Sequence, residues 1–393
     1  MNFDLADEQR LLRDAARDAL ARLDSVAGAR DALDGAPLPD PWPTARAAGW
    51  TGLLVGEKDG GAGLDVFDAM LVLEECGRRL TGAGLIGHLA ATRLLAGAAG
   101  RGDVGAAAVL PSLAAGDRCA AIVLARPPAA DEKPWTVEAE AGGTRRAPLP
   151  TAQPGGGCDA VLVTGEAGYQ LDAAGADLLV VPAVLGTGEH RATLVAADAA
   201  GLAVEATPRG DASRPIARVS LEGTPAILLH AGPDDLADVW DVVQALLAAD
   251  ALGVSEAMLD MGVAYAKDRH AFGRPIGSYQ AIKHQLVEIL RHVEATRSLC
   301  YYVGYAARER PSDLPLASAC ARFAAEDAAT YATRTCIAIH GGIGTTWEHD
   351  APLFWRRAQL SRLLAGGVTG AGDRVATEIV KHARAQAGAT ATT

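Results

Sequence analysis

The chain has 393 residues and carries 36 Lys and Arg against 48 Asp and Glu, so its formal net charge is −12. This acidic balance argues against nucleic acid as the main partner, because binding to phosphates needs a basic face. Hydrophobic residues make up 49% of the chain and charged residues 21%, a composition typical of folded proteins. At about 100–200 residues per domain, the length allows two or three domains.

The composition also bears on compartment and on metal or disulfide chemistry. No run approaches the roughly 20 consecutive apolar residues of a membrane helix, and the N-terminal segment is charged throughout. The six cysteines are scattered, without a Cys-x-x-Cys pair or a Cys/His cluster. We therefore expect a soluble cytoplasmic protein, with no membrane contact, no metal site and no disulfides.

The pattern of apolar residues changes twice along the chain. Between Leu5 and Leu113 they recur at helical spacing, interrupted by proline-rich and glycine-rich loops. From Cys119 to Leu229 short apolar runs alternate with turn residues, which predicts strands of a small antiparallel domain. Beyond Asp234 long helical stretches return. The predicted domains are a helical domain at 1–116, a β domain at 117–230 and a helical bundle at 231–393.

A segment between two predicted long helices, Arg269 to Gln280, reads RHAFGRPIGSYQ. An arginine, a glycine and the start of a helix can together hold a pyrophosphate. The guanidinium offers a bidentate fork, and the helix start offers free N–H groups. The alternative is an ordinary turn between helices, in which Arg269 caps backbone carbonyls.

A second motif, His340 to Glu348, reads HGGIGTTWE and follows another predicted helix. Its glycines allow the backbone to approach a ligand or a neighbouring helix closely. Taken alone, the motif is weak, because glycines after helices are common C-caps.

These two motifs, together with the N-terminal segment DLADEQRLLRDAARD, resemble the acyl-CoA dehydrogenase family over essentially the whole chain. The resemblance implies an α+β fold with an N-terminal all-α domain, a middle β-barrel domain and a C-terminal four-helix bundle. It also implies FAD as cofactor, an acyl-CoA thioester as substrate and a tetrameric assembly. Family members remove the α-proton with a carboxylate while the β-hydrogen leaves as hydride to the flavin.

The resemblance assigns residues of both motifs to the adenosine half of FAD, which in this family usually lies at a subunit interface. Arg269 resembles the arginine that binds the pyrophosphate. The other residues assigned in this way are Phe272, Ile276 and Gln280, with Gly341 and Gly342 approaching the dinucleotide from the partner side. The alternatives are core packing for the two apolar side chains and a helix cap for the glycines.

The position of the family's catalytic glutamate falls on Ala365, which cannot accept a proton. Some members carry the base on the first helix of the bundle, where the matching residue is Val243. Asp241 lies two residues away, a rotation of about 200° on a helix, which makes it a poor substitute. Glu256 lies several turns further on, and Glu348 matches a glutamate that we interpret as structural. We assign no catalytic residue and keep Asp241 as the remaining candidate.

The elements that contact the flavin ring in the family also differ. Residues 125–132 lack the glycines and hydroxyls of the corresponding family loop. The strand resembling the family's ring-contacting strand is 165–172, in which the aromatic residue is Tyr169 and a threonine is replaced by Leu171. A glutamine often found before the double glycine is Ala338 here.

The residues assigned to the adenosine half of FAD match the family, whereas those at the base and flavin-ring positions differ. This contrast predicts that one chain binds the adenosine half and another supplies the base and the ring pocket. We expect a partner subunit of a heteromeric FAD-dependent acyl-CoA dehydrogenase, a heterotetramer with two copies of each chain, in which a second acyl-CoA dehydrogenase-like chain brings the base. Likeness to actinobacterial members through Leu364–Gly370 suggests a steroid side-chain CoA as substrate. The alternatives are a self-sufficient homotetramer with Asp241 as base and a non-enzymatic scaffold or acyl-CoA binder.

Overall fold

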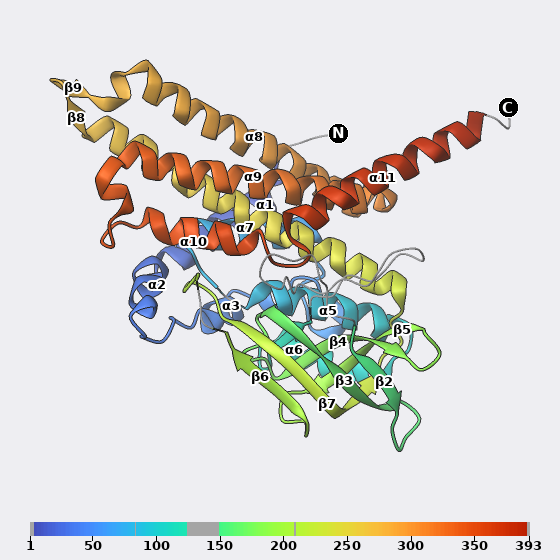
Figure 1. Ribbon diagram of the computed structural model, residues 1–393. Helices are drawn as coiled ribbons and strands as arrows, with labels where there is room; N and C mark the ends of the chain where they lie inside the picture. The colour runs from blue at the N-terminus through green and yellow to red at the C-terminus, as the bar shows by residue number, and fades with distance from the viewer. Residues whose placement is uncertain (1–3, 83, 124–148, 208–209, 391–393) are drawn as a thin grey trace.

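The computed structural model describes residues 4–82, 84–123, 149–207 and 210–390. Helices form the two ends of this part of the chain and strands form its middle (Figure 1). The helical bundle of the C-terminal part lies on one side of the molecule and the β-strands lie on the other, with α5 between them (Figure 1). The predicted α+β fold class is confirmed.

The N-terminal part is helical. Its α-helices are α1 (Asp7–Ala21), α2 (Ser25–Leu33), α3 (Trp42–Ala47), α4 (Val66–Arg78), α5 (Leu85–Gly100) and α6 (Val104–Ala114). The carboxylate of Asp65 caps α4 by accepting from the backbone N–H of Phe67 at 2.8 Å, and the Asp103 carboxylate caps α6 by accepting from that of Ala106 at 2.8 Å. Such caps satisfy N–H groups that the first helical turn leaves free, so both helices begin at a defined residue.

The middle part forms a seven-stranded sheet. Its strands are β1 (Ala120–Ile122), β2 (Thr151–Pro154), β3 (Ala160–Leu171), β4 (Leu178–Leu185), β5 (His190–Ala196), β6 (Leu202–Ala206) and β7 (Ile216–Leu228). The order is β1-β4-β2-β3-β7-β5, with β6 paired to β7 outside this path. Because β4 also pairs with β5, the sheet closes on itself as a barrel.

The expectation of a purely antiparallel domain was wrong at one strand. β4 runs parallel to both β1 and β2, whereas the other pairs are antiparallel. Parallel neighbours need a long crossover connection, which a helix usually supplies. Here β3 lies in the connection from β2 to β4, so the sequence shows no helical pattern at the crossover.

The C-terminal part begins with α7 (Pro233–Asp268) and continues with α8 (Gln280–Glu309), α9 (Leu314–His340), α10 (Ala351–Ser361) and α11 (Gly367–Thr390). By length and hydropathy α7 would suffice to cross a membrane, but 89% of its apolar window is buried inside the protein. Its composition therefore matches a core helix, against which α4, α8 and α9 pack.

Two glycines set how closely α4 and α7 approach each other. A Cβ atom at Gly253 would lie 1.9 Å from the carbonyl oxygen of Glu74, and one at Gly77 would lie 2.0 Å from that of Asp250. Real Cβ atoms do not approach an oxygen this closely, so the two backbones are in direct contact at the crossing. Only glycine fits at these two positions.

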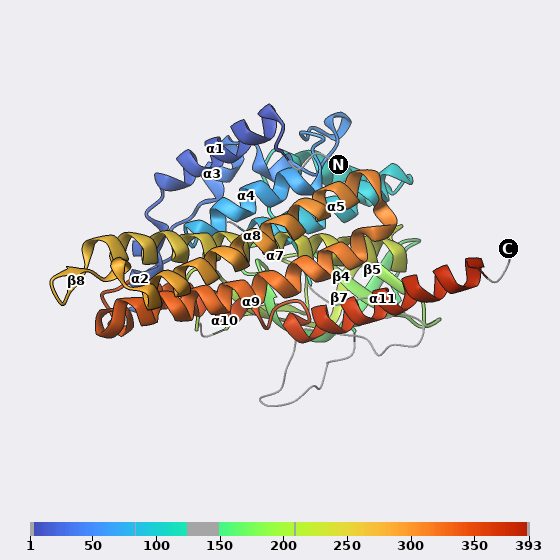
Figure 2. The same cartoon turned by 90° about the horizontal axis from the view of Figure 1, so that it is seen from above.

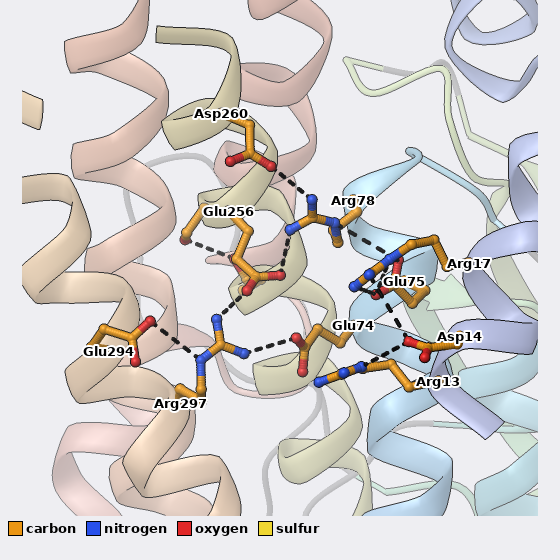
Figure 3. A network of polar contacts seen from close by, with 12 residues as sticks. Arg13, Asp14, Arg17, Glu74, Glu75, Arg78, Glu256, Asp260, Glu294 and Arg297 are labelled. Atoms are coloured by element: carbon orange, nitrogen blue, oxygen red, sulfur yellow. Dashed lines mark hydrogen bonds and ion pairs between the residues drawn. The ribbon is translucent and has the colours of Figure 1, made fainter. Parts of the chain in front are cut away.

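Charged side chains beside this crossing bind α4, α7 and α8 together (Figure 3). Glu256 of α7 accepts from Arg78 of α4 at 2.8 Å and also pairs with Arg297 of α8. Arg297 in turn donates to Glu74 at 3.0 Å. Burial and the neighbouring Glu256 carboxylate raise the pKa of Glu74 to about 8. Glu256 is thus engaged with two arginines that join helices, as expected of a structural residue.

Replacing Gly253 with alanine is expected to destabilise the protein by about 3 kcal/mol, because the added methyl forces α4 and α7 apart. The matched control is Gly100→Ala at the end of α5, where an added Cβ meets no atom within 4 Å. There the same exchange is expected to be neutral or to stabilise by about 0.5 kcal/mol. Urea unfolding curves of the two variants measure the difference, and equal curves would contradict the close crossing.

Candidate cofactor site

The segment between α7 and α8 is a two-stranded hairpin at one tip of the helical layer (Figure 1). Its strands are β8 (His270–Ala271) and β9 (Arg274–Pro275). The Arg269 N–H donates to the Tyr265 carbonyl at 2.9 Å and ends α7, and the Arg269 carbonyl accepts from the Ile276 N–H at 2.8 Å. The backbone of Arg269 therefore closes the base of the hairpin and ends the helix.

Phe272 lies at the tip of this hairpin and is 96% exposed. Its φ is 53° and that of Gly273 is 79°, the positive pair found in tight hairpin turns. Left-handed backbone is costly for a bulky residue, and an exposed aromatic ring gains nothing from the fold. The structure excludes core packing for Phe272, whereas Ile276 is half-buried.

Two contacts brace the hairpin, and neither of them involves the Arg269 side chain. The guanidinium of Arg274 lies over the Tyr279 ring, 4.1 Å from its centroid, and the Tyr279 hydroxyl donates to the Ala271 carbonyl at 3.0 Å. Arg269 is exposed, and its guanidinium bonds to no residue within the described ranges. Gln280 is exposed where α8 begins. An unpaired guanidinium close to a helix start suits an anion.

The double glycine follows the end of α9. Gly341 is the C-cap of that helix, with φ 63° and its N–H directed at the Ala338 carbonyl, so the helix-cap interpretation holds for this residue. Gly341 and Gly342 are both exposed, and a Cβ at either position would meet no atom within 4 Å. The backbone is therefore open to a ligand at these two residues, beside an exposed Ala338.

A ring stack joins the two motifs. The Tyr265 and His340 rings lie 4.1 Å apart at 26°, and the His340 ring nitrogen Nδ1 lies 2.8 Å from the Cys336 carbonyl. Since Tyr265 holds the Arg269 backbone and His340 precedes Gly341, this stack places both motifs at the same end of the bundle. Sequence reasoning placed His340 at the start of its motif but assigned no role to it or to Tyr265. Their spacing was the available signal: Tyr265 lies four residues before Arg269, and His340 lies directly before the double glycine.

The residue at the family's base position is buried. Ala365 is 1% exposed, and its carbonyl accepts from the Gln244 side-chain amide at 3.1 Å. The preceding turn is held by Arg322, which donates to the Ser361 carbonyl at 2.6 Å. Val243 is also buried. Ala365 and Val243 thus place two apolar side chains where the resemblance would put a carboxylate.

Asp241 is 3% exposed near the start of α7. Burial raises its pKa to about 7, although Arg374 opposes the shift. The other charges that act on it come from Asp238, Glu378 and Lys381, so most of them belong to α11. A carboxylate with a pKa near 7 is electrostatically suited to act as a base.

The structure describes only some of the positions that contact the flavin ring in the family. Residues 125–132 and the Tyr169 side chain lie outside the described part of the structure. Leu171 is buried, and the carboxylate of Asp172 accepts from the Gly87 N–H at 2.9 Å. The cavity that these two residues line has a volume of about 10 Å³, room for one water molecule.

A buried charge cluster faces this end of β3. Arg357 donates to Asp250 at 2.5 Å, to the Ser213 hydroxyl at 2.8 Å and to the Thr81 carbonyl at 2.9 Å. Arg214 lies 3.5 Å from the same aspartate. Burial alone would raise the pKa of Asp250, but the two guanidiniums outweigh it and hold the pKa below its usual range. The cluster joins all three parts of the chain.

Known proteins resemble this chain in sequence and in fold. The family models of the acyl-CoA dehydrogenase N-terminal and C-terminal domains match residues 6–117 and 241–370. The acyl-CoA dehydrogenase FadE34 of Mycobacterium tuberculosis is 40% identical over 156 residues, which are 39% of this chain and 22% of FadE34. The chain therefore aligns with less than a quarter of that relative's length.

Two solved structures share the fold over nearly the whole chain. A variant of the Tcur3481-Tcur3483 steroid ACAD (acyl-CoA dehydrogenase) is 27% identical with a TM-score of 0.82, covering 96% of this chain and 99% of that chain. The ChsE4-ChsE5 complex of Mycobacterium tuberculosis is 23% identical with a TM-score of 0.82, covering 97% and 99%, which shows the fold alone. The resemblance seen in the sequence is confirmed: the chain belongs to the acyl-CoA dehydrogenase family, whose members are oxidoreductases that act on CH–CH bonds.

Proposed function

We propose that this chain is the partner subunit of a heteromeric FAD-dependent acyl-CoA dehydrogenase, which introduces an α,β double bond into an acyl-CoA thioester. The observation that carries the proposal is the contrast between the two ends of the bundle. The base position is the buried methyl group of Ala365, whereas Arg269 and Phe272 are presented to solvent at the far tip. A second chain supplies the base and the pocket for the flavin ring.

The separation of these two ends supports the proposal. Gln244, which holds Ala365, and Arg269 are 25 residues apart along α7. At a rise of about 1.5 Å per residue this is about 37 Å, longer than an extended dinucleotide. The Arg269 end of one chain therefore serves a cofactor whose ring lies in another chain, and the alanine at position 365 favours a different chain over a second copy of this one.

The residues at the tip fit the adenosine half of FAD. The free guanidinium of Arg269 can bind the pyrophosphate through two hydrogen bonds, and Phe272 offers an apolar face. The open backbone of Gly341 and Gly342 can approach the dinucleotide closely. FAD, when bound, takes the hydride from the β-carbon. This chain's own residues bind and orient the cofactor end that does not react.

The neighbours support a second chain and suggest a substrate class. One similar structure is described as the ChsE4-ChsE5 complex, and the other pairs Tcur3481 with Tcur3483 as a steroid ACAD. We extend both descriptions to this chain. The partner is a second acyl-CoA dehydrogenase-like chain in a heterotetramer with two copies of each, and the substrate is a steroid side-chain CoA thioester.

The chain is to be produced with a second dehydrogenase-like chain that carries a glutamate at the base position. Arg269→Ala is expected to weaken FAD binding about tenfold to a hundredfold, because charge-assisted bonds to the pyrophosphate are lost. Bound flavin and the oligomeric state are measured, and the oligomeric state should not change. The matched control is Arg22→Ala, an exposed arginine at the end of α1. A lone chain that is yellow and active would contradict the proposal.

A second candidate function is a self-sufficient enzyme in which Asp241 is the base, favoured by its pKa of about 7. If that candidate is right, the lone chain is active and Asp241→Asn abolishes its activity. If this chain is the partner subunit, the same variant leaves the activity of the complex unchanged. Absence of flavin from every combination of chains would favour a non-enzymatic scaffold instead.

The buried carboxyl of Asp241 also predicts a pH dependence of stability. Since its folded pKa of about 7 exceeds the ordinary aspartate value of 3.8, its protonated form is favoured by folding. The stability it contributes is complete below about pH 4 and is lost as the pH rises through about 7. Asp241→Asn should therefore remove part of this loss, and its melting temperature should exceed that of the parent at pH 8.5. Asp34→Asn, at an exposed aspartate directly after α2, is the control.

A further inference from the structure

A groove with a volume of about 430 Å³ lies between α8 and α9, here named the α8–α9 groove. The two helices run side by side along the bundle (Figure 2). Gln285 lines the groove from α8, and residues between Asp327 and Ala338 line it from one face of α9. Since Ala338 lies three residues before Gly341, the groove begins beside the candidate cofactor site and runs back along α9.

Arg334 brings an unpaired positive charge to this groove. It is exposed, and its guanidinium bonds to no residue in the part of the chain that the structure describes. Asp327 also lines the groove, but it lies seven residues earlier, about 10 Å along α9, and 3.8 Å from Nδ1 of His292. Gln285 is exposed on the facing helix. The end of the groove near Ala338 therefore offers a cation and an amide to a ligand.

The alanine at position 338 leaves room for this guanidinium. A helical side chain covers the surface over the turn N-terminal to its own Cα. A long side chain at position 338 would therefore lie over Arg334, one turn earlier. Ala338 is itself exposed and covers none of this surface. Family members often carry a glutamine at this position, so Arg334 stands where that amide would lie.

The spacing of the two unpaired arginines suits the two parts of an adenosine diphosphate unit. The stacked rings of Tyr265 and His340 set the ends of α7 and α9 at the same level. Arg269 lies four residues beyond Tyr265, and Arg334 lies six residues before His340. At about 1.5 Å per residue, the two side chains start about 15 Å apart along the bundle. Two long side chains can approach one ligand across this span, with Ala338 between them.

The side chains in the groove also suit the chemistry of an adenosine. Adenine presents an acceptor nitrogen beside an amino group, which a glutamine amide matches with its own donor and acceptor. A guanidinium is planar, donates to ring nitrogens and ribose oxygens, and can lie over the face of an aromatic ring. Gln285 and Arg334 lie outside residues 269–280 and 340–348, which carry the resemblance to the family.

We propose that the α8–α9 groove receives the adenosine of FAD, with Gln285 and Arg334 as its contacts, while Arg269 binds the pyrophosphate. This step rests on the proposed function, under which this chain holds the adenosine half of the cofactor. Arg334 makes the contact that a glutamine at position 338 would otherwise make.

The first test measures binding of FAD and of ADP to the co-expressed complex after its flavin has been removed, by titration calorimetry. Arg334→Ala should weaken both ligands about tenfold and Gln285→Ala about threefold, with unchanged melting temperature. The matched control is Arg79→Ala, an exposed arginine at the C-cap of α4. Unchanged affinity in Arg334→Ala, or a loss seen with FAD and not with ADP, would overturn the proposal.

Coenzyme A also carries an adenosine and a pyrophosphate, so the occupant of the groove must be distinguished from the substrate. The complex loaded with FAD is titrated with coenzyme A. Equal affinity in Arg334→Ala and in the parent supports the cofactor as the occupant. A lower affinity for coenzyme A in the variant would assign the groove to the substrate and overturn the proposal.

The second test restores the lost contact from position 338. Added to Arg334→Ala, the change Ala338→Gln should recover most of the lost affinity for ADP, because its amide reaches the same place. Ala338→Leu has a similar length but no amide, and it should recover none. A purely structural role of Arg334 would not be rescued in this way. Equal behaviour of the two variants at position 338 would contradict the placement of Arg334.

The outcomes separate the groove from the proposed function. A complex that binds FAD with the same affinity in Arg334→Ala and in the parent refutes the groove assignment alone. Flavin and activity in the lone chain would refute the partner-subunit function, whereas the titrations with ADP and coenzyme A would still report on the groove.

Discussion

The buried ion pair between Arg357 and Asp250 is the contact on which the relative placement of the three parts of the chain depends. The same guanidinium reaches Thr81, which lies before α5, and Ser213, which lies before β7. A buried pair of this kind adds little net stability, but loss of one partner leaves an unpaired charge and costs about 3–5 kcal/mol. The pair therefore fixes how the β domain sits on α7, and Arg214 strengthens it from the β side.

Contacts along α7 fix the position of the neighbouring helices from this ion pair to the far end of the bundle. Direct backbone contact at Gly77 and Gly253 prevents α4 and α7 from sliding, and the arginines that bind Glu256 extend the contact to α8. At its C-terminal end the Tyr265 ring stacks on His340 and holds α9 in register. One continuous set of rigid contacts thus runs from the buried ion pair to the exposed hairpin.

The sequence predicted what local patterns encode. The long helices on either side of Arg269 and the strand-rich middle follow from the period of apolar residues, whereas the two-stranded hairpin between those helices was not predicted. The parallel pairing of β4 with β1 and β2 left no local signal in the sequence. It depends on which strands lie between the paired strands along the chain. The cluster of Thr81, Ser213, Asp250 and Arg357 was likewise invisible, since residues so distant in sequence share no spacing. The exposure of Phe272 excludes core packing for its ring, and a pattern of residue types cannot give that exposure.

A chain without a base at the family position still needs the whole fold if its task is to present one end of a cofactor site. Under the proposed function, Arg269 and the double glycine must keep a fixed geometry to bind the cofactor, and that geometry depends on α7 and α9 ending in register. Register in turn depends on the close crossing with α4 and on the buried pair with the β domain. The loss of the base at Ala365 is therefore compatible with a fully maintained scaffold, because the residues that hold the tip are distinct from those that would act on a substrate.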